Sequence, residues 1–73
     1  MRPYVKRLVK ETIVCHLKSG ESLRGILMAA HSDVLLFEQA AALTAEAPVT
    51  ADGVAVVPRA NVAWMQHLPG AQQ

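Results

Sequence analysis

Most of the chain follows the two-residue periodicity of β-strands, in which successive side chains face opposite sides of a sheet. In the first such run, Ile13, Cys15 and Leu17 share one face. A turn follows at residues 19–21, where Gly20 can adopt the positive φ that a tight turn needs. The pattern therefore predicts a first strand that is joined to the next strand by a hairpin.

The second run contains a glycine where a strand would ordinarily carry a side chain. Leu23, Gly25 and Leu27 share one face of this run. Glycine weakens the interior of a strand unless the strand bends there or another backbone approaches closely. We therefore expect the second strand to bend sharply at Gly25, so that a single sheet folds back on itself.

Three further strands are expected after this bend. The first of them follows a turn at residues 31–33 and contains the apolar run VLLF, which is typical of a strand covered on both faces. The next follows the turn signal Asp52-Gly53, and Pro58 marks its end because proline cannot donate to a sheet. The expected strands are residues 12–18, 23–28, 34–39, 53–57 and 61–68.

Three segments outside the strands complete the prediction. Residues 3–10 predict a short helix, because Pro3 suits a first helical turn and four apolar residues share one face. That face comprises Tyr4, Val5, Leu8 and Val9. Residues 41–53 predict a variable connection, and residues 69–73 a loose tail. The whole chain, residues 1–73, is therefore expected to form one mainly β domain: a short N-terminal helix followed by a five-stranded, strongly bent antiparallel SH3-like barrel.

Size and composition favour association between copies. The chain has 73 residues, of which 52% are hydrophobic. A domain of this size buries only about 60% of the surface that its unfolded chain exposes. Its one cysteine excludes an internal disulfide. We therefore expect part of the apolar surface to lie at an interface.

Net charge and hydropathy limit the kinds of binding partner and the cellular locations that the sequence permits. The net charge of +1 disfavours a protein that covers phosphates extensively, although it permits a small local basic site. No apolar run approaches the roughly 20 residues of a membrane span. The charged start MRPYVKRLVKE does not resemble a secretory signal. Together with an unpaired Cys15, these features predict a cytoplasmic protein that does not bind membranes.

Residue types that carry catalysis are present but are not arranged for it. His31, Ser32 and Asp33 are triad residue types, yet neighbours in sequence cannot adopt triad geometry. Cys15 and His16 are adjacent in a strand and therefore face opposite sides. The sequence has no glycine-rich phosphate loop and no metal-ligand spacing. We expect no enzymatic activity, no metal, no cofactor and no small-molecule substrate.

Two segments carry a resemblance to a known family. Residues 14–27, VCHLKSGESLRGIL, combine apolar alternation with a Lys-x-Gly turn and a Gly-x-Leu bend. Residues 56–65, VVPRANVAWM, contain Asn61 followed by a valine near the start of the last strand. These segments resemble the two motifs of the Sm/LSm family, which includes the bacterial RNA chaperone Hfq. The likeness extends over residues 2–68, and small Sm-like proteins of bacteriophages are one further similar group.

The resemblance implies a closed homo-oligomeric ring, most often a hexamer or heptamer. In that family the fourth strand of one subunit pairs with the fifth strand of its neighbour. Physical reasoning points the same way, because an unpaired apolar edge strand invites aggregation and ring closure removes it. The interface candidates are Val54, Val56, Val62, Trp64 and Met65. For Trp64 and Met65, a place in the core of the subunit is an equally good interpretation.

The resemblance also implies single-stranded RNA at the pore, held by two loop elements. His31 and Asp33 occupy the family's His-x-Asn element, and His31 is expected to stack on a base. Asp33 replaces the family's amide, and a ring of carboxylates repels phosphate. In the second element Pro58 stands where the family has arginine, Arg59 takes the glycine position and Asn61 matches. The alternative interpretation makes Asp33 and Asn61 turn residues and Arg59 a solvated corner.

Two functions therefore remain open from the sequence. The first is a ring that binds U- or A-rich single-stranded RNA around its pore through His31, Asp33, Arg59 and Asn61. The second is a non-enzymatic structural or protein-interaction ring of phage or prophage type that does not bind RNA. The balanced charge and Asp33 favour the second function, whereas the family resemblance favours the first.

Overall fold

The computed structural model describes residues 3–43, 49–50 and 53–70. Its elements, in chain order, are α1 (Pro3–Lys6), β1 (Thr12–Leu17), β2 (Ser22–Ala30), β3 (Val34–Ala42), β4 (Val49–Thr50), β5 (Val54–Pro58), the 3-10 turn η1 (Arg59–Asn61) and β6 (Val62–Leu68). Parts of the predicted connection and tail, and Arg2 of the resemblance, lie outside the described residues.

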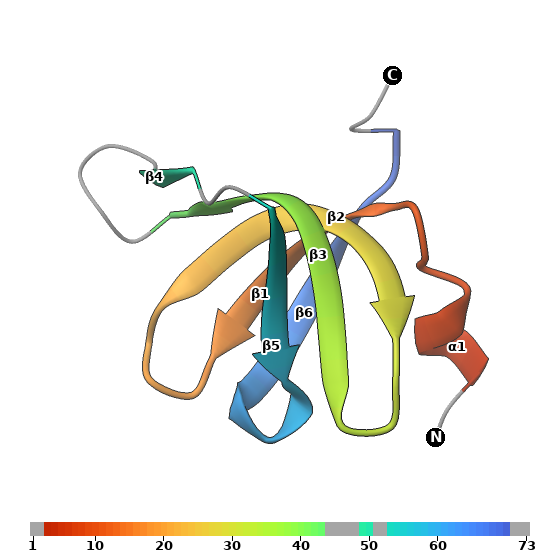
Figure 1. Ribbon diagram of the computed structural model, residues 1–73, viewed down its shortest axis with the longest axis horizontal. Helices are drawn as coiled ribbons and strands as arrows, with labels where there is room; N and C mark the ends of the chain where they lie inside the picture. Colours follow the sequence, from red (N-terminus) through yellow and green to blue (C-terminus); the bar gives the residue numbers. More distant parts are fainter. Residues whose placement is uncertain (1–2, 44–48, 51–52, 71–73) are drawn as a thin grey trace.

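The strands form one antiparallel sheet in the order β4-β3-β2-β1-β6, and β5 also pairs with β3. Figure 1 shows β2 and β3 curving together over the remaining strands. The predicted fold class is confirmed, since each of the expected strands is present and a short helix precedes them. The sequence did not predict β4, a strand of 2 residues within the predicted connection. This strand exists because β3 runs beyond its predicted end and offers further backbone groups for pairing.

The bend predicted at Gly25 has a visible cause. A Cβ atom at Gly25 would lie 3.2 Å from the carbonyl oxygen of Glu38 and 3.2 Å from the Cβ of Phe37. The pairing of β2 with β3 also shifts register between Arg24 and Ile26. Glycine is therefore favoured at this position, because a side chain there would be tightly packed against β3 at the bend.

The core fills the inside of the bent sheet. Its largest fully buried side chains are Phe37, Ile13, Leu27, Leu35 and Cys15, all below 2% exposure. These residues come from β1, β2 and β3, and Ile13, Cys15 and Leu27 lie on the faces that the two-residue periodicity distinguished in the first two strands. The third strand was expected to be covered on both faces, but within its apolar run only Leu35 and Phe37 are buried, whereas β1 buries both of its faces near Thr12 and Val14.

The N-terminal helix is shorter than predicted. It ends at Lys6, and the chain continues through turns in which Leu8 N–H donates to the Val5 carbonyl at 3.0 Å. The turn ends at Lys10, which has a φ of 75° and donates its N–H to the Leu27 carbonyl at 2.6 Å. That bond to β2 ends the helical path. The predicted apolar face was wrong for Tyr4, which is 61% exposed.

The last strand contains a β-bulge that the sequence did not reveal. Val62 pairs with Leu17 and Trp64 pairs with His16, so Ala63 is an additional residue opposite β1. A bulge interrupts the alternation of side chains by one residue. Trp64 consequently lies exposed on the outer face, whereas Met65 packs against the core.

Candidate functional site

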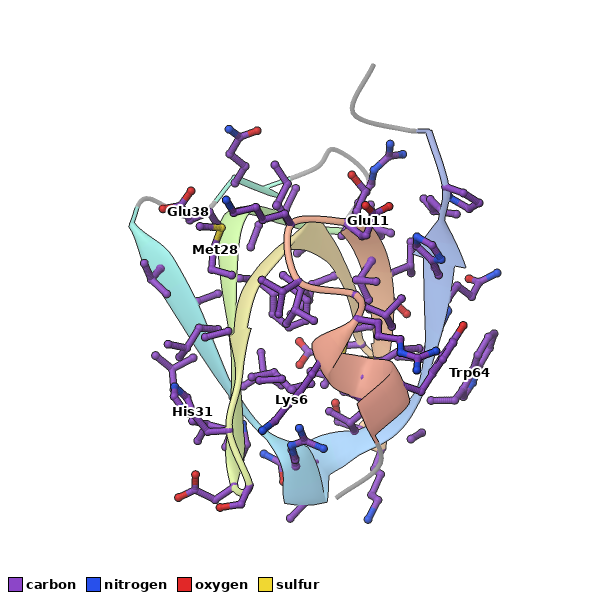
Figure 2. The ribbon with its side chains drawn as sticks, turned by 90° about the vertical axis from the view of Figure 1, so that its right-hand side faces the viewer. Lys6, Glu11, Met28, His31, Glu38 and Trp64 are labelled. Carbon is purple, nitrogen blue, oxygen red and sulfur yellow. The ribbon has the colours of Figure 1, made fainter. Side chains whose placement is uncertain are left out.

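The two ends of the bent sheet are open. Among the described residues, β5 pairs only with β3, and β6 pairs only with β1. In Figure 2 the two strands lie on opposite sides of the barrel, with Trp64 projecting outward beside β6. Each strand therefore presents a row of unpaired backbone groups, and the two rows face away from each other.

The β5 edge has a defined set of outward backbone groups. The Arg59 N–H donates to the Asp33 carbonyl at 2.9 Å, just beyond the Val34–Pro58 pair. In an antiparallel ladder this geometry marks a non-hydrogen-bonded pair, and the two kinds of pair alternate along the strands. Val54, Val56 and Pro58 therefore direct their backbone groups away from β3, and Pro58 contributes only a carbonyl.

The predicted interface residues fall into two groups. Val54 is 49% exposed, Val56 is 60% exposed and Trp64 is 55% exposed. Val62 and Met65 instead pack against the core of the subunit, which matches the core interpretation for Met65. For Trp64 the core interpretation was wrong, because the bulge turns its side chain outward.

Trp64 is held in place by His16, a residue to which the sequence analysis gave no functional role. The rings of His16 and Trp64 stack with centroids 3.9 Å apart and planes inclined by 16°. His16 is itself fixed by two hydrogen bonds of 2.9 Å, one between Nδ1 and the Ser22 hydroxyl and one between Nε2 and the Gln66 side-chain oxygen. Only the register of β1 with β6 brings these residues together, so no local sequence signal could have shown it.

The predicted RNA-binding residues are only partly brought together. The β2–β3 turn is closed by the His31 N–H, which donates to the Val34 carbonyl at 2.9 Å, and His31 and Asp33 are both exposed. Arg59 joins this turn to the β5–β6 corner. Its Nε–H donates to the His31 carbonyl at 2.5 Å, and its backbone N–H donates to the Asp33 carbonyl at 2.9 Å. Arg59 thus lies at a partly exposed corner, and its side chain also binds the β2–β3 turn.

Asn61 faces a different neighbour. Its carbonyl accepts a hydrogen bond from the Lys18 N–H at 2.8 Å, which ties it to the β1–β2 turn. With Leu17, Lys18, Ser19 and Glu21 it lines a recess of about 360 Å³. The structure thus connects Asn61 to the first hairpin, while Arg59 is connected to the second turn.

The remaining polar groups have structural roles. Glu11 and His67 approach to 2.9 Å at the end of the barrel, both partly exposed, and such pairs stabilise proteins by about 1 kcal/mol or less. Burial raises the pKa of the Cys15 thiol, which makes this residue a small apolar member of the core. Within residues 3–43, 49–50 and 53–70, no three His, Cys, Asp or Glu side chains are grouped to hold a metal ion. None of the described helices is long and apolar enough to cross a membrane.

Comparison with known proteins bears on the fold. No family model matches the chain, and no curated protein matches it significantly. Among solved structures, a heptameric archaeal Sm protein has a TM-score of 0.82 at 22% identity, covering 93% of this chain and 100% of its own. A Pyrococcus abyssii Sm protein in complex with a uridine heptamer has a TM-score of 0.80 at 21% identity, covering 93% and 100%. A structure of the NatC complex bound to CoA has a TM-score of 0.73 at 21% identity, covering 84% and 79%.

These likenesses define the class of architecture. Two Sm proteins match 93% of this chain over their whole length. The chain therefore has the Sm fold, as the two sequence motifs led us to expect. The similarity to bacteriophage proteins stays a prediction.

Proposed function

We propose that this chain assembles head to tail into a closed homo-oligomeric ring, in which β5 of one copy pairs with β6 of the next. The two open edges are different surfaces on opposite sides of the subunit, and contacts of this kind close into a ring when the rotation permits. Association would remove the exposed Val54, Val56 and Trp64 from water. The heptameric assembly of an archaeal Sm protein with the same fold supports this proposal.

We further propose that the ring binds single-stranded RNA, with no enzymatic role. The observation that carries this proposal is the joining of two turns by Arg59, which gathers an exposed imidazole, a carboxylate and a guanidinium at one end of the barrel. Exposed aromatic rings and arginine planes are the groups on which proteins stack unpaired bases. The complex of a similarly folded Sm protein with a uridine heptamer supports RNA as the ligand. Asn61, at the end of the same corner, is a further candidate contact.

A second candidate is a ring that binds protein and not RNA. The specific observation in its favour is the exposed carboxylate of Asp33 beside His31, combined with a net charge of only +1. A ring of such carboxylates repels phosphate. A chain of the NatC complex has a similar fold, so this fold also occurs within a protein assembly. A shared fold does not imply that this chain binds CoA. The expected cytoplasmic location stays a prediction.

Native mass spectrometry of the purified protein, read with its absorbance ratio at 260 and 280 nm, tests both proposals at once. We expect a closed oligomer that binds mixed-sequence single-stranded RNA in an anisotropy titration at low salt. Arg59→Ala is expected to weaken this binding by at least about tenfold, because the side chain orders both turns and because a ring repeats each contact.

Arg24→Ala provides the matched control, since it removes one exposed arginine from β2 and leaves the β2–β3 turn intact. A monomer at high concentration would refute the ring. An intact ring that purifies free of nucleic acid and ignores RNA would refute RNA binding and leave the protein-interaction ring as the function.

A further inference from the structure

The turn between β2 and β3 carries a carboxylate where bases are proposed to bind. Asp33 is exposed, and its position is fixed from two directions. The turn is closed by the bond from His31 N–H to the Val34 carbonyl at 2.9 Å, and the Asp33 carbonyl accepts the Arg59 N–H at 2.9 Å. The side chain therefore projects from an ordered backbone, which is the condition for selective hydrogen bonding.

The chemistry of a carboxylate restricts the base it can accept. An ionised aspartate has acceptor oxygens only. The pairing edge of uracil presents one N–H between two carbonyl oxygens, so a carboxylate would gain one hydrogen bond and face two repulsive acceptors. Adenine and cytosine each present one amino group beside an acceptor nitrogen. Guanine presents two adjacent donors, N1–H and the N2 amino group, which match the two oxygens of a carboxylate.

We propose that Asp33 is a specificity-determining residue that selects guanine in single-stranded RNA. This inference rests on the RNA binding proposed above and departs from the U- or A-rich RNA expected from the family resemblance. His31, two positions earlier in the same turn and also exposed, provides an aromatic face on which the selected base stacks.

Arg59 makes this arrangement compatible with an anionic ligand. Its Nε–H is bound to the His31 carbonyl at 2.5 Å, so the guanidinium lies beside the turn that carries Asp33. A cation at this place offsets the repulsion between the carboxylate and the phosphates. Arg59 is thus a positioning residue for the turn, while Asp33 reads the base edge.

The test compares three labelled six-nucleotide RNAs by fluorescence anisotropy at fixed low salt: U6, alternating UG, and the same alternating sequence with inosine for guanosine. Inosine keeps N1–H but lacks the N2 amino group. We expect wild-type protein to bind the UG repeat more tightly than U6 by roughly 5- to 150-fold per contacted base. Inosine should lose most of this gain. Asp33→Asn, which restores both a donor and an acceptor, should bind U6 more tightly than wild type and lose the preference for guanine.

Ser32→Ala is the matched control, because it changes the neighbouring exposed residue of the same turn, and it should leave the preference unchanged. Equal binding of U6 and the UG repeat by wild type, or a guanine preference that survives in Asp33→Asn, overturns the inference and leaves RNA binding in place. Failure of wild type, Asp33→Asn and Ser32→Ala to bind any of the RNAs as intact rings overturns the inference together with the proposed function.

Discussion

At the scale of single residues, the least replaceable position is a glycine. Gly25 is buried, and its backbone lies where any Cβ would come within 3.2 Å of β3. Glycine is favoured at this position by the limited space beside β3 and not by an unusual backbone φ. Gly20 differs, since its φ is 98° and a methyl group added there would meet no atom within 4 Å.

We predict that Gly25→Ala lowers the free energy of unfolding by about 1–3 kcal/mol, because the added methyl group forces β2 and β3 apart at the bend. Urea unfolding followed by the fluorescence of the single tryptophan measures the change. Gly20→Ala serves as the comparison that introduces backbone strain without a steric contact. An unchanged unfolding midpoint for Gly25→Ala would show that the close approach is not required.

Only some features of the candidate site could be predicted from the sequence. His31, Asp33 and Arg59 were chosen as residue types suited to base stacking and charge recognition, and the structure joins them through backbone carbonyls. Sequence reasoning missed His16 as the support of Trp64. The reason is physical, because a cross-strand stack depends on register, and register is decided by the pairing of β1 with β6.

At the scale of elements, the strands were predictable and their irregularities were not. Alternation in β1 and the apolar run in β3 identify strands because one face of each must be buried. The helix end at Lys6 and the short strand β4 depend on hydrogen-bond partners elsewhere in the chain. The bulge in β6 is the irregularity with the largest consequence, since it decides which of Trp64 and Met65 faces the core.

We predict that deletion of Ala63 removes the bulge and leaves the indole of Trp64 exposed. Without the additional residue, strict alternation from the inward Val62 places Trp64 outward and Met65 toward the core, as in the wild type. The tryptophan emission maximum measures the exposure of the indole, and urea unfolding measures the change in stability.

Ala63→Gly keeps the chain length and should cost only about 1 kcal/mol. A blue-shifted emission maximum in the deletion variant would mean that Trp64 has turned toward the core and that β6 has changed its register against β1.

At the scale of the whole molecule, the bent sheet leaves two apolar edges that a single copy does not cover. Val54 and Val56 are exposed on one edge, and Trp64 is exposed on the other. Such edges are ordinarily protected by charge, by proline or by pairing. Pairing between copies is the protection that this surface fits, which is why assembly precedes ligand binding in the proposed function.

We predict that Val56→Lys converts the proposed ring into smaller species in native mass spectrometry, because it places a charge on the apolar β5 edge. Tyr4→Lys is the matched control: it replaces another exposed apolar side chain, at 61% exposure, which belongs to α1 and not to an edge strand. Circular dichroism should show that both variants fold. A ring that survives Val56→Lys would place the subunit contact elsewhere.

The sequence by itself determined the class of the fold, because two-residue alternation, turn glycines and a glycine within the second strand leave few ways to bury the apolar faces. It also supplied the residue types of the candidate site. Only the tertiary structure decided which strands keep a free edge, where β6 bulges, and that Arg59 binds the carbonyl groups of the β2–β3 turn. These features arise from contacts between segments far apart in the chain, for which local pattern holds no signal.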